Sequence, residues 1–346
     1  MTVVVEVVRN GFVESVHHVS VAAVDPAGRC VLSAGDPDRP VLPRSANKPL
    51  QAVAMLRSGL ALEGADLALA AASHSGEPRH VERVRGLLAR GGFGEEDLQC
   101  PAQLPIDDVE AAAVLRAGGM PSRVLMNCSG KHAAMLLTCQ VAGWSVTDYL
   151  AETHPLQQEV RRVVEELAAE PVTATGVDGC GAPLFAISLL GVARAFAAMV
   201  RATPGTPARL VADAMRAYPE MVAGHRREDT QLMRAVPGLL MKGGAEGVHA
   251  AALADGSAVA IKVEDGAVRA RMPVLVEVLR RLGATGYSRL GAGGDSRLGV
   301  GGDVLDEHAS TVVLGGGAPV GAVRLPAGAF DRPRAAPPVP EAPRES

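Results

Sequence analysis

Hydrophobic positions follow two kinds of pattern along the chain, and their order predicts the fold class. Residues 1–35 are rich in valine, and they are interrupted by Asn10-Gly11 and by a second turn sequence, DPAG, as between antiparallel strands. Residues 247–270 alternate between apolar and polar positions and are divided by two Asp-Gly pairs, which is typical of a β-meander. Strands are therefore predicted near both ends of the chain.

Between these regions, hydrophobic residues recur at helical spacing, which predicts a helical block over about residues 49–235. Periodicity and terminal glycine or proline predict helices over 49–58, 77–90, 132–141, 146–152, 154–170, 183–201 and 208–218, with a last helix over 272–282. Strands and helices are segregated along the chain, which is typical of an α+β fold. We expect an antiparallel sheet formed from both chain ends, with the helical block packed against it.

The predicted domain organisation follows from the absence of a linker-like segment in most of the chain. Residues 1–328 are predicted to form a single two-lobed domain, and residues 329–346, which are rich in proline and charge, a disordered tail. Residues 286–303 contain an imperfect glycine-rich repeat, SRLGAGGD followed by SRLGVGGD, which predicts a flexible loop.

Composition and charge narrow the class of partner. The 346 residues are 48% hydrophobic, so the chain can bury a large core without disulfides or a metal. A net charge of −4 attracts neither nucleic acid nor an anionic membrane, so we expect a small-molecule substrate or copies of the chain itself. The N-terminus lacks the pattern of a signal peptide, and the five cysteines are odd in number and widely spaced. We therefore expect reduced thiols and a cytoplasmic location.

Ser45 and Lys48 stand three residues apart in the stretch SANKPLQ. In a helix this spacing puts both side chains on one face, where a neutral lysine can take the proton of a serine hydroxyl and make it a nucleophile. Pro49 favours the first helical position, which would leave Ser45 just outside the helix. The alternative interpretation is a helix N-terminus with a solvated lysine.

Polar residues also gather where the apolar run 65–72 ends, in the stretch ASHSGEPRH. Ser73, His74 and Ser75 either line a pocket at the end of this buried segment or cap the helix that follows. Both interpretations are open from these residues alone.

Two further stretches, NCSGKHAAM and VDGCGAP, supply thiols and an amine in glycine-rich turns. Cys128 and Lys131 belong to the first, and Cys180 follows Asp178 by two residues in the second. The spacing of the cysteines differs from that of the common zinc motifs, so two partly buried structural cysteines are the alternative interpretation. His132 is a more usual metal ligand beside Cys128.

Six stretches in order resemble the rhizobial-type L-asparaginases, also called the thermolabile or asparaginase II family: SANKPLQA, ASHSGEPRH, NCSGKHAAML, DGCGAP, KGGAEG and AIKVEDG. The resemblance covers about residues 5 to 325. It implies a fold similar to that of serine β-lactamases and glutaminases, a homodimer, and hydrolysis of the side-chain amide of L-asparagine to L-aspartate and ammonia.

The resemblance also implies roles for individual residues. Ser45 with Lys48 and Ser73 with Lys262 would form two Ser-Lys pairs, with Ser75 as the alternative to Ser73. The family's zinc site, in which the metal helps to position the substrate, would correspond to Cys128, Lys131 and Cys180. Asp178 and His74 would contact the substrate or support the site. Relatives carry a third cysteine near GAEG where this chain has Val248 and His249, so that thiol is not a required ligand here.

Three functions are compatible with these residues. The first is the asparaginase activity. The second is another serine amidohydrolase of the same fold, such as a glutaminase or a β-lactam hydrolase, because a pocket that fits one more methylene discriminates by only about 1–3 kcal/mol. The third is a zinc- or thiol-binding protein without catalysis.

Overall fold

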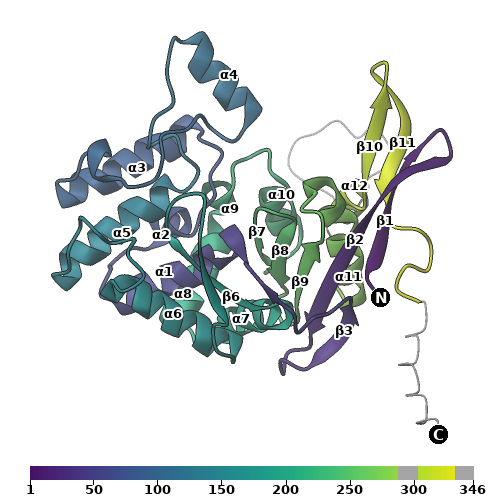
Figure 1. The fold of residues 1–346 in the computed structure, drawn as a ribbon, viewed down its shortest axis with the longest axis horizontal. Helices are drawn as coiled ribbons and strands as arrows, with labels where there is room; N and C mark the ends of the chain where they lie inside the picture. Colours follow the sequence, from purple (N-terminus) through teal and green to yellow (C-terminus); the bar gives the residue numbers. More distant parts are fainter. Residues whose placement is uncertain (287–302, 332–346) are drawn as a thin grey trace, which may run out of the picture.

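An antiparallel sheet built from both ends of the chain organises the molecule (Figure 1). The computed structural model describes residues 1–286 and 303–331. In the eight-stranded sheet the order is β10-β11-β1-β2-β9-β8-β7, with β3 also paired to β2. The strands are β1 (Val3–Arg9), β2 (Phe12–Val24), β3 (Cys30–Ala34), β7 (Leu240–Gly243), β8 (Val248–Ala252), β9 (Ala258–Val263), β10 (Ser310–Gly315) and β11 (Ala318–Arg324).

Most helices form a block at one side of this sheet, between β3 and β7 in the chain. The α-helices are α1 (Lys48–Arg57), α2 (Gly64–Ala70), α3 (Pro78–Gly91), α4 (Asp108–Arg116), α5 (Ser129–Ala142), α6 (Pro155–Ala168), α7 (Leu189–Arg201), α8 (Pro207–Ala217), α9 (Pro219–Val222), α10 (Glu228–Ala235), α11 (Arg271–Arg281) and α12 (Val304–His308). Short 3-10 helices are η1 (Arg44–Asn47), η2 (Glu95–Asp97) and η3 (Val268–Ala270). A second sheet has the order β4 (Pro40–Val41), β6 (Pro183–Ser188) and β5 (Ala174–Val177).

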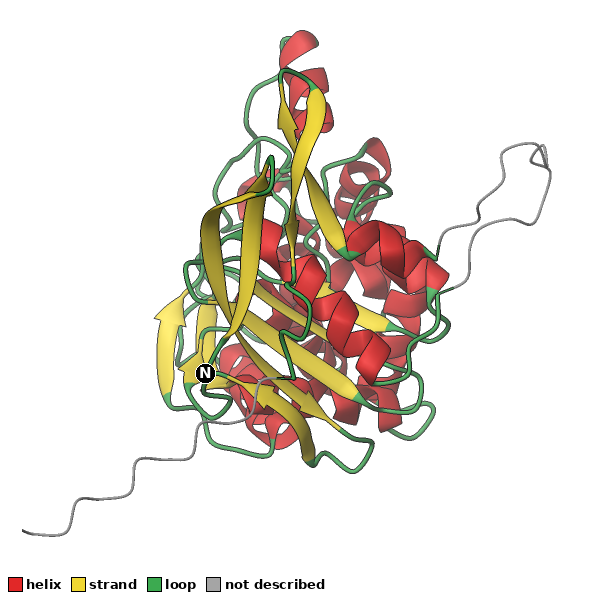
Figure 2. Ribbon diagram, turned by 90° about the vertical axis from the view of Figure 1, so that its right-hand side faces the viewer, coloured by secondary structure: helices red, strands yellow, loops and turns green. Residues whose placement is uncertain are grey.

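The centre of the large sheet is covered on both faces. Helices lie in front of and behind it in Figure 2, and both α7 and α11 pack against β8 and β9. Every residue of β8 is buried, and so are all residues of β9 except Lys262. Alanine fills much of these strands, which lets the covering helices approach closely. None of the helices within the described parts of the chain is both long and apolar enough to cross a membrane.

The predicted α+β class, with an antiparallel sheet from both chain ends and a helical block, is confirmed. Helices were correctly predicted near α1, α3, α5, α6, α8 and α11. The division into a domain of residues 1–328 and a tail stays a prediction. Most of the glycine-rich repeat and of the expected tail, residues 287–302 and 332–346, lie outside the described residues.

Two predicted features were wrong, and one feature was not predicted. The expected helix 183–201 is a strand, β6, followed by α7, because the Ser188 hydroxyl accepts a hydrogen bond from the Gly191 N–H and caps a new helix there. Residues 146–152 form turns, in which Tyr149 is buried and fixes the chain by accepting a hydrogen bond from the Gln99 N–H. Strands also continue after α11, since β10 and β11 complete the sheet beside β1.

Candidate active site

Ser73 lies between two lysine amines in the interior of the molecule. The Lys48 Nζ donates to the Ser73 Oγ over 2.9 Å, and the Lys242 Nζ donates to the same oxygen over 3.0 Å. Each lysine is only 1% exposed, and Ser73 is 5% exposed. Lys48 also donates to the Ala72 carbonyl, and Lys242 to the Gly243 carbonyl. A hydroxyl in contact with two buried amines can pass a proton to either one when that amine is neutral.

Three separate parts of the fold bring these groups together. Lys48 is the first residue of α1, where the preceding η1 packs against β7 and β8. Ser73 follows the end of α2, and its N–H is tied to the Val222 carbonyl. Lys242 stands in the fully buried strand β7. Residues far apart in sequence therefore meet where the helical block adjoins the edge of the sheet.

Burial lowers the pKa of Lys242 to about 7. The Asp229 carboxylate opposes this shift, and the charge of Lys48 adds to it. A lysine amine that titrates near neutral pH is substantially unprotonated there, so it can act as a base without strongly alkaline conditions.

Ser45 lies one turn before Lys48, on η1. The proline at position 49 does not separate them, because η1 runs directly into α1 and the Lys48 N–H donates to the Ser45 carbonyl. Ser45 is partly exposed, and its hydroxyl makes no hydrogen bond within residues 1–286 and 303–331. Its oxygen is therefore available to an incoming group, whereas that of Ser73 is already bound.

The predicted pairing of Ser73 with Lys262 needs correction. The Lys262 Nζ donates to the Glu246 and Val263 carbonyls, each over 2.6 Å, and the second amine at Ser73 belongs to Lys242. Lys262 is on β9, two strands away from β7, and its register partner on β8 is Val248. The missed lysine opens the KGGAEG stretch, but nothing local to that stretch distinguishes it from Lys262, which also stands in a largely buried strand.

Ser75 and His74 turn away from the two amines. The Ser75 hydroxyl donates to the Ala223 carbonyl over 2.7 Å, so Ser73 and not Ser75 is the serine at the lysines. Burial holds the pKa of His74 well below its usual value, and the neutral ring uses both nitrogens. Its Nε2 contacts the Ser129 Oγ, and its Nδ1 accepts from the Gly76 N–H. His74 supports the turn that carries Ser73.

Cys128, Lys131 and Cys180 form a buried cluster at the start of α5. The Lys131 Nζ donates to the Cys180 Sγ over 3.1 Å. The nearby Cys128, with the charge of Lys131, holds the pKa of Cys180 far below its usual value, against the effect of burial. His132 stands beside Cys180, with its Nδ1 2.9 Å from the Tyr149 hydroxyl.

The donor chemistry of this cluster fits a zinc ion. The Lys131 amine contacts the Cys180 sulfur, and Cys128 lies close enough to affect the pKa of Lys131. Three protein ligands with a fourth open position are usual for a zinc that meets a substrate. Within the described residues no three His, Cys, Asp or Glu side chains are grouped to hold a metal, so Lys131 has to be the third donor. The ion would have to displace the Lys131 proton. Zinc at this cluster stays a prediction.

Arg44, which the sequence interpretation missed, joins Asp178 at this site. The Arg44 Nε donates to the Asp178 Oδ1 over 2.8 Å, and a guanidinium nitrogen lies 3.7 Å from a Glu246 carboxylate oxygen. Arg44 has a φ of 51°, in the left-handed region that a residue with a side chain seldom adopts. Such strain is often retained where a side chain must point toward a functional site. Its place directly before Ser45 was the signal in the sequence.

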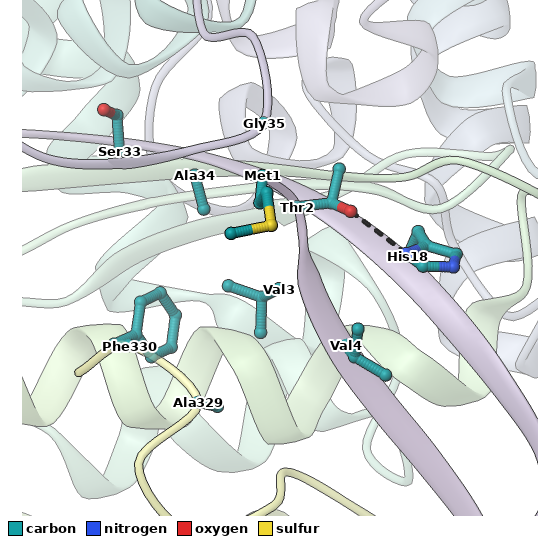
Figure 3. A pocket seen from close by; sticks show the side chains of 10 residues that line it. All are labelled: Met1, Thr2, Val3, Val4, His18, Ser33, Ala34, Gly35, Ala329 and Phe330. Carbon is teal, nitrogen blue, oxygen red and sulfur yellow. Dashed lines mark hydrogen bonds between the residues drawn. The ribbon is translucent and has the colours of Figure 1, made fainter. Parts of the chain in front are cut away.

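A separate cavity of about 310 Å³ lies at the N-terminus and does not include the candidate site (Figure 3). It is lined by β1, by the end of β3 and by Ala329 and Phe330, and the Thr2 hydroxyl contacts the His18 ring there. None of the serines, lysines or cysteines described above belongs to its lining, so this cavity is separate from the candidate active site.

A buried serine between two amines, beside a helix-covered antiparallel sheet, defines a candidate serine hydrolase that uses lysines as bases. A family model described as L-asparaginase II matches residues 5–324, and the chain therefore belongs to the L-asparaginase II family, which places it among the amidohydrolases. The comparison with curated proteins gives no match.

Three solved structures are distantly similar. Mglu in its native form is 14% identical, with a TM-score of 0.38 over 72% of this chain and 59% of that chain. A β-lactamase from Mycobacterium bovis is 17% identical, with a TM-score of 0.41 over 76% of this chain and 94% of that chain. EstCE1, a hydrolase with promiscuous acyltransferase activity, is 14% identical, with a TM-score of 0.37 over 71% and 88%. The chain thus spans about three fifths of Mglu, and at these TM-scores the similarities carry no weight for the activity.

Proposed function

We propose that the protein hydrolyses the side-chain amide of L-asparagine to L-aspartate and ammonia. The observation that carries the proposal is the Ser73 hydroxyl held between the Lys48 and Lys242 amines, with Ser45 one turn away, in a chain of the L-asparaginase II family. Amide hydrolysis needs a nucleophile, a base and a proton donor for the leaving ammonia, and these four side chains supply all three.

In this mechanism Ser45 is the nucleophile, because its hydroxyl is partly exposed and has no bound partner in the described part of the chain. Its proton passes to Lys48 as the Ser45 oxygen bonds to the amide carbon, while Lys48 gives up a proton through Ser73 to the neutral Lys242 amine. Lys48 contacts Ser73, which contacts Lys242, so the proton can travel along this chain to the leaving nitrogen. The carbon–nitrogen bond then breaks and ammonia leaves. Water cleaves the resulting ester and releases L-aspartate.

Charged side chains near Ser45 would bind the two ends of the amino acid. The Arg44 guanidinium suits the substrate carboxylate, and the Asp178 carboxylate suits its ammonium group. A zinc ion held by Cys128, Lys131 and Cys180 would supply positive charge for orienting the substrate. The homodimer implied by the family resemblance and the cytoplasmic location expected from the N-terminus and the cysteines also remain predictions.

The test measures ammonia release from L-asparagine and L-glutamine by wild type, Ser45→Ala and Ser73→Ala. Wild type should favour L-asparagine, and each variant should lose at least about a hundredfold in kcat. Undiminished turnover by Ser45→Ala would exclude it as the nucleophile. A preference for L-glutamine would support the glutaminase alternative, and no release from either amide would support a binding protein.

A further inference from the structure

A buried carboxylate, Asp229, lies near Lys242 and is bonded to the backbone of the residue that follows it. Asp229 belongs to the first turn of α10 and is 1% exposed. Its Oδ1 accepts a hydrogen bond from the Gly243 N–H over 2.7 Å, and its Oδ2 has no hydrogen-bond partner within the described residues. An ionised carboxylate is costly to bury, so its place beside β7 requires an explanation in terms of the charges near it.

The Gly243 peptide links this carboxylate to the catalytic amine. The Gly243 carbonyl accepts from the Lys242 Nζ over 2.7 Å, while the N–H of the same residue is held by Asp229. The next carbonyl, that of Gly244, accepts from the buried Arg271 over 3.1 Å, and Arg271 is anchored in turn by Glu228. The backbone that follows Lys242 is therefore fixed from α10 and α11.

The charges that act on Lys242 leave Asp229 as its main anionic neighbour. Lys48 and Arg227 are cationic, and the Cys128 thiol contributes a smaller effect than either. His249 lies closest to the carboxylate, with its Nε2 3.3 Å from the Asp229 Oδ1. Burial lowers the pKa of His249, and an Arg227 guanidinium nitrogen lies 3.9 Å from the Asp229 Oδ2.

We propose that Asp229 is a positioning residue for Lys242, which it serves by fixing the Gly243 peptide and by balancing the charge of the amine at Ser73. The proposal rests on the proposed function in one respect, namely that Lys242 takes part in the proton relay. Without the carboxylate, a second ammonium beside Lys48 would be disfavoured, and the relay would hold fewer protons at a given pH.

Asp229→Asn tests the charge while keeping an oxygen that can accept from the Gly243 N–H. The titration of Lys242 is followed by NMR of its ε-carbon in protein with 13C-labelled lysine, the signal being assigned through Lys242→Met. The wild-type midpoint is expected near pH 7. In Asp229→Asn it should fall by about one pH unit or more, and the acid limb of kcat should move in the same direction. An unchanged midpoint would overturn the proposal.

Glu228→Gln is the matched control, because it removes the adjacent carboxylate of the same helical turn, which pairs with Arg271. It should leave the Lys242 midpoint within a few tenths of a pH unit. Asp229→Ala removes the acceptor as well as the charge, and its kcat should fall about tenfold below that of Asp229→Asn with KM nearly unchanged. Equal kcat values for these two variants would contradict the role of the Gly243 hydrogen bond.

The two measurements separate this proposal from the proposed function. If the NMR midpoint shifts in a protein that releases no ammonia, the coupling of Asp229 to Lys242 is supported and the asparaginase function is overturned. Normal ammonia release without any shift in midpoint would retain the activity and overturn the role of Asp229.

Discussion

Lys242 and Lys131 are both fully buried lysines near the candidate site, yet their proton affinities change in opposite directions. Burial lowers the pKa of Lys242 to about 7, because Asp229 offsets only part of that cost and Lys48 adds to it. Burial also disfavours the charged form of Lys131, but the Cys180 and Cys128 sulfurs raise its pKa overall. Lys242 and Lys131 are equally buried, so the neighbouring charges decide whether a buried amine is a base or a cation.

The largest predicted effect comes from removing the base. Lys242→Met should lower kcat by about 10²–10⁴-fold, the usual range for loss of a general acid–base group, without loss of folding. Lys262→Met is the control, since that amine is bound to two backbone carbonyls elsewhere on the sheet. Steady-state ammonia assays compare the two variants. A greater loss of kcat in Lys262→Met would mean that Lys262, and not Lys242, is the base paired with Ser73.

Changing the surroundings of Lys131 should affect metal binding and KM more than kcat. Cys180→Ala takes away the sulfur beside Lys131 and a predicted zinc ligand, so bound zinc should be lost and KM for L-asparagine should rise about 10- to 100-fold. Zinc content by elemental analysis and KM with and without a chelator are the measurements. Cys139→Ala removes a buried thiol outside the cluster and should retain both the metal and KM.

Stability against pH gives a smaller effect that depends on Lys242 alone. Because its folded pKa is about 7 and that of an unfolded lysine is near 10.4, the unfolded chain binds more protons between these values. The contribution of Lys242 to the free energy of unfolding is fully present above about pH 10 and is lost as the pH falls through about 7. The free energy of unfolding should therefore rise with pH over this window, by at most about 1.4 kcal/mol per unit, in wild type relative to Lys242→Met. Urea unfolding at several pH values measures it, and parallel profiles would contradict the lowered pKa.

Ser75→Ala should have the smallest effect. It removes one buried hydrogen bond, to the Ala223 carbonyl, and should cost about 1 kcal/mol of unfolding free energy while changing kcat less than threefold. Thermal unfolding and ammonia assays on the same preparation test both parts. A loss of activity as large as that of Ser73→Ala would mean that the wrong serine has been placed at the lysines.

Local pattern explains why some of the site could be predicted and some could not. Ser45 and Lys48 are three residues apart, so their proximity is a property of one turn, and the ASH stretch supplied Ser73 through family resemblance. The choice between Lys242 and Lys262 depends on which of two strands brings its lysine to Ser73, and that is set by the order β7-β8-β9, in which β8 pairs with both neighbours. No local signal carries this information.

The fold shows the same division. Valine-rich runs with turn sequences between them predicted the N-terminal strands, because period and turn chemistry agree there. The apolar run 183–201 has no such agreement, since a fully buried strand and a buried helix have similar composition, and only the cap at Ser188 divides it. Arg44 was missed because a strained φ is imposed by the tertiary structure and leaves no trace in residue type.

The joining of β1 to β11 and of β2 to β9 has a consequence for biosynthesis. The first hairpin leaves the ribosome early but cannot acquire its outer neighbour until residues 318–324 have been made. Until then its backbone hydrogen-bonding groups are open to other nascent chains. Contacts that span almost the whole polypeptide also slow folding. The half-finished chain should therefore depend on chaperones, and truncation before β11 should yield insoluble product even though every active-site residue is retained.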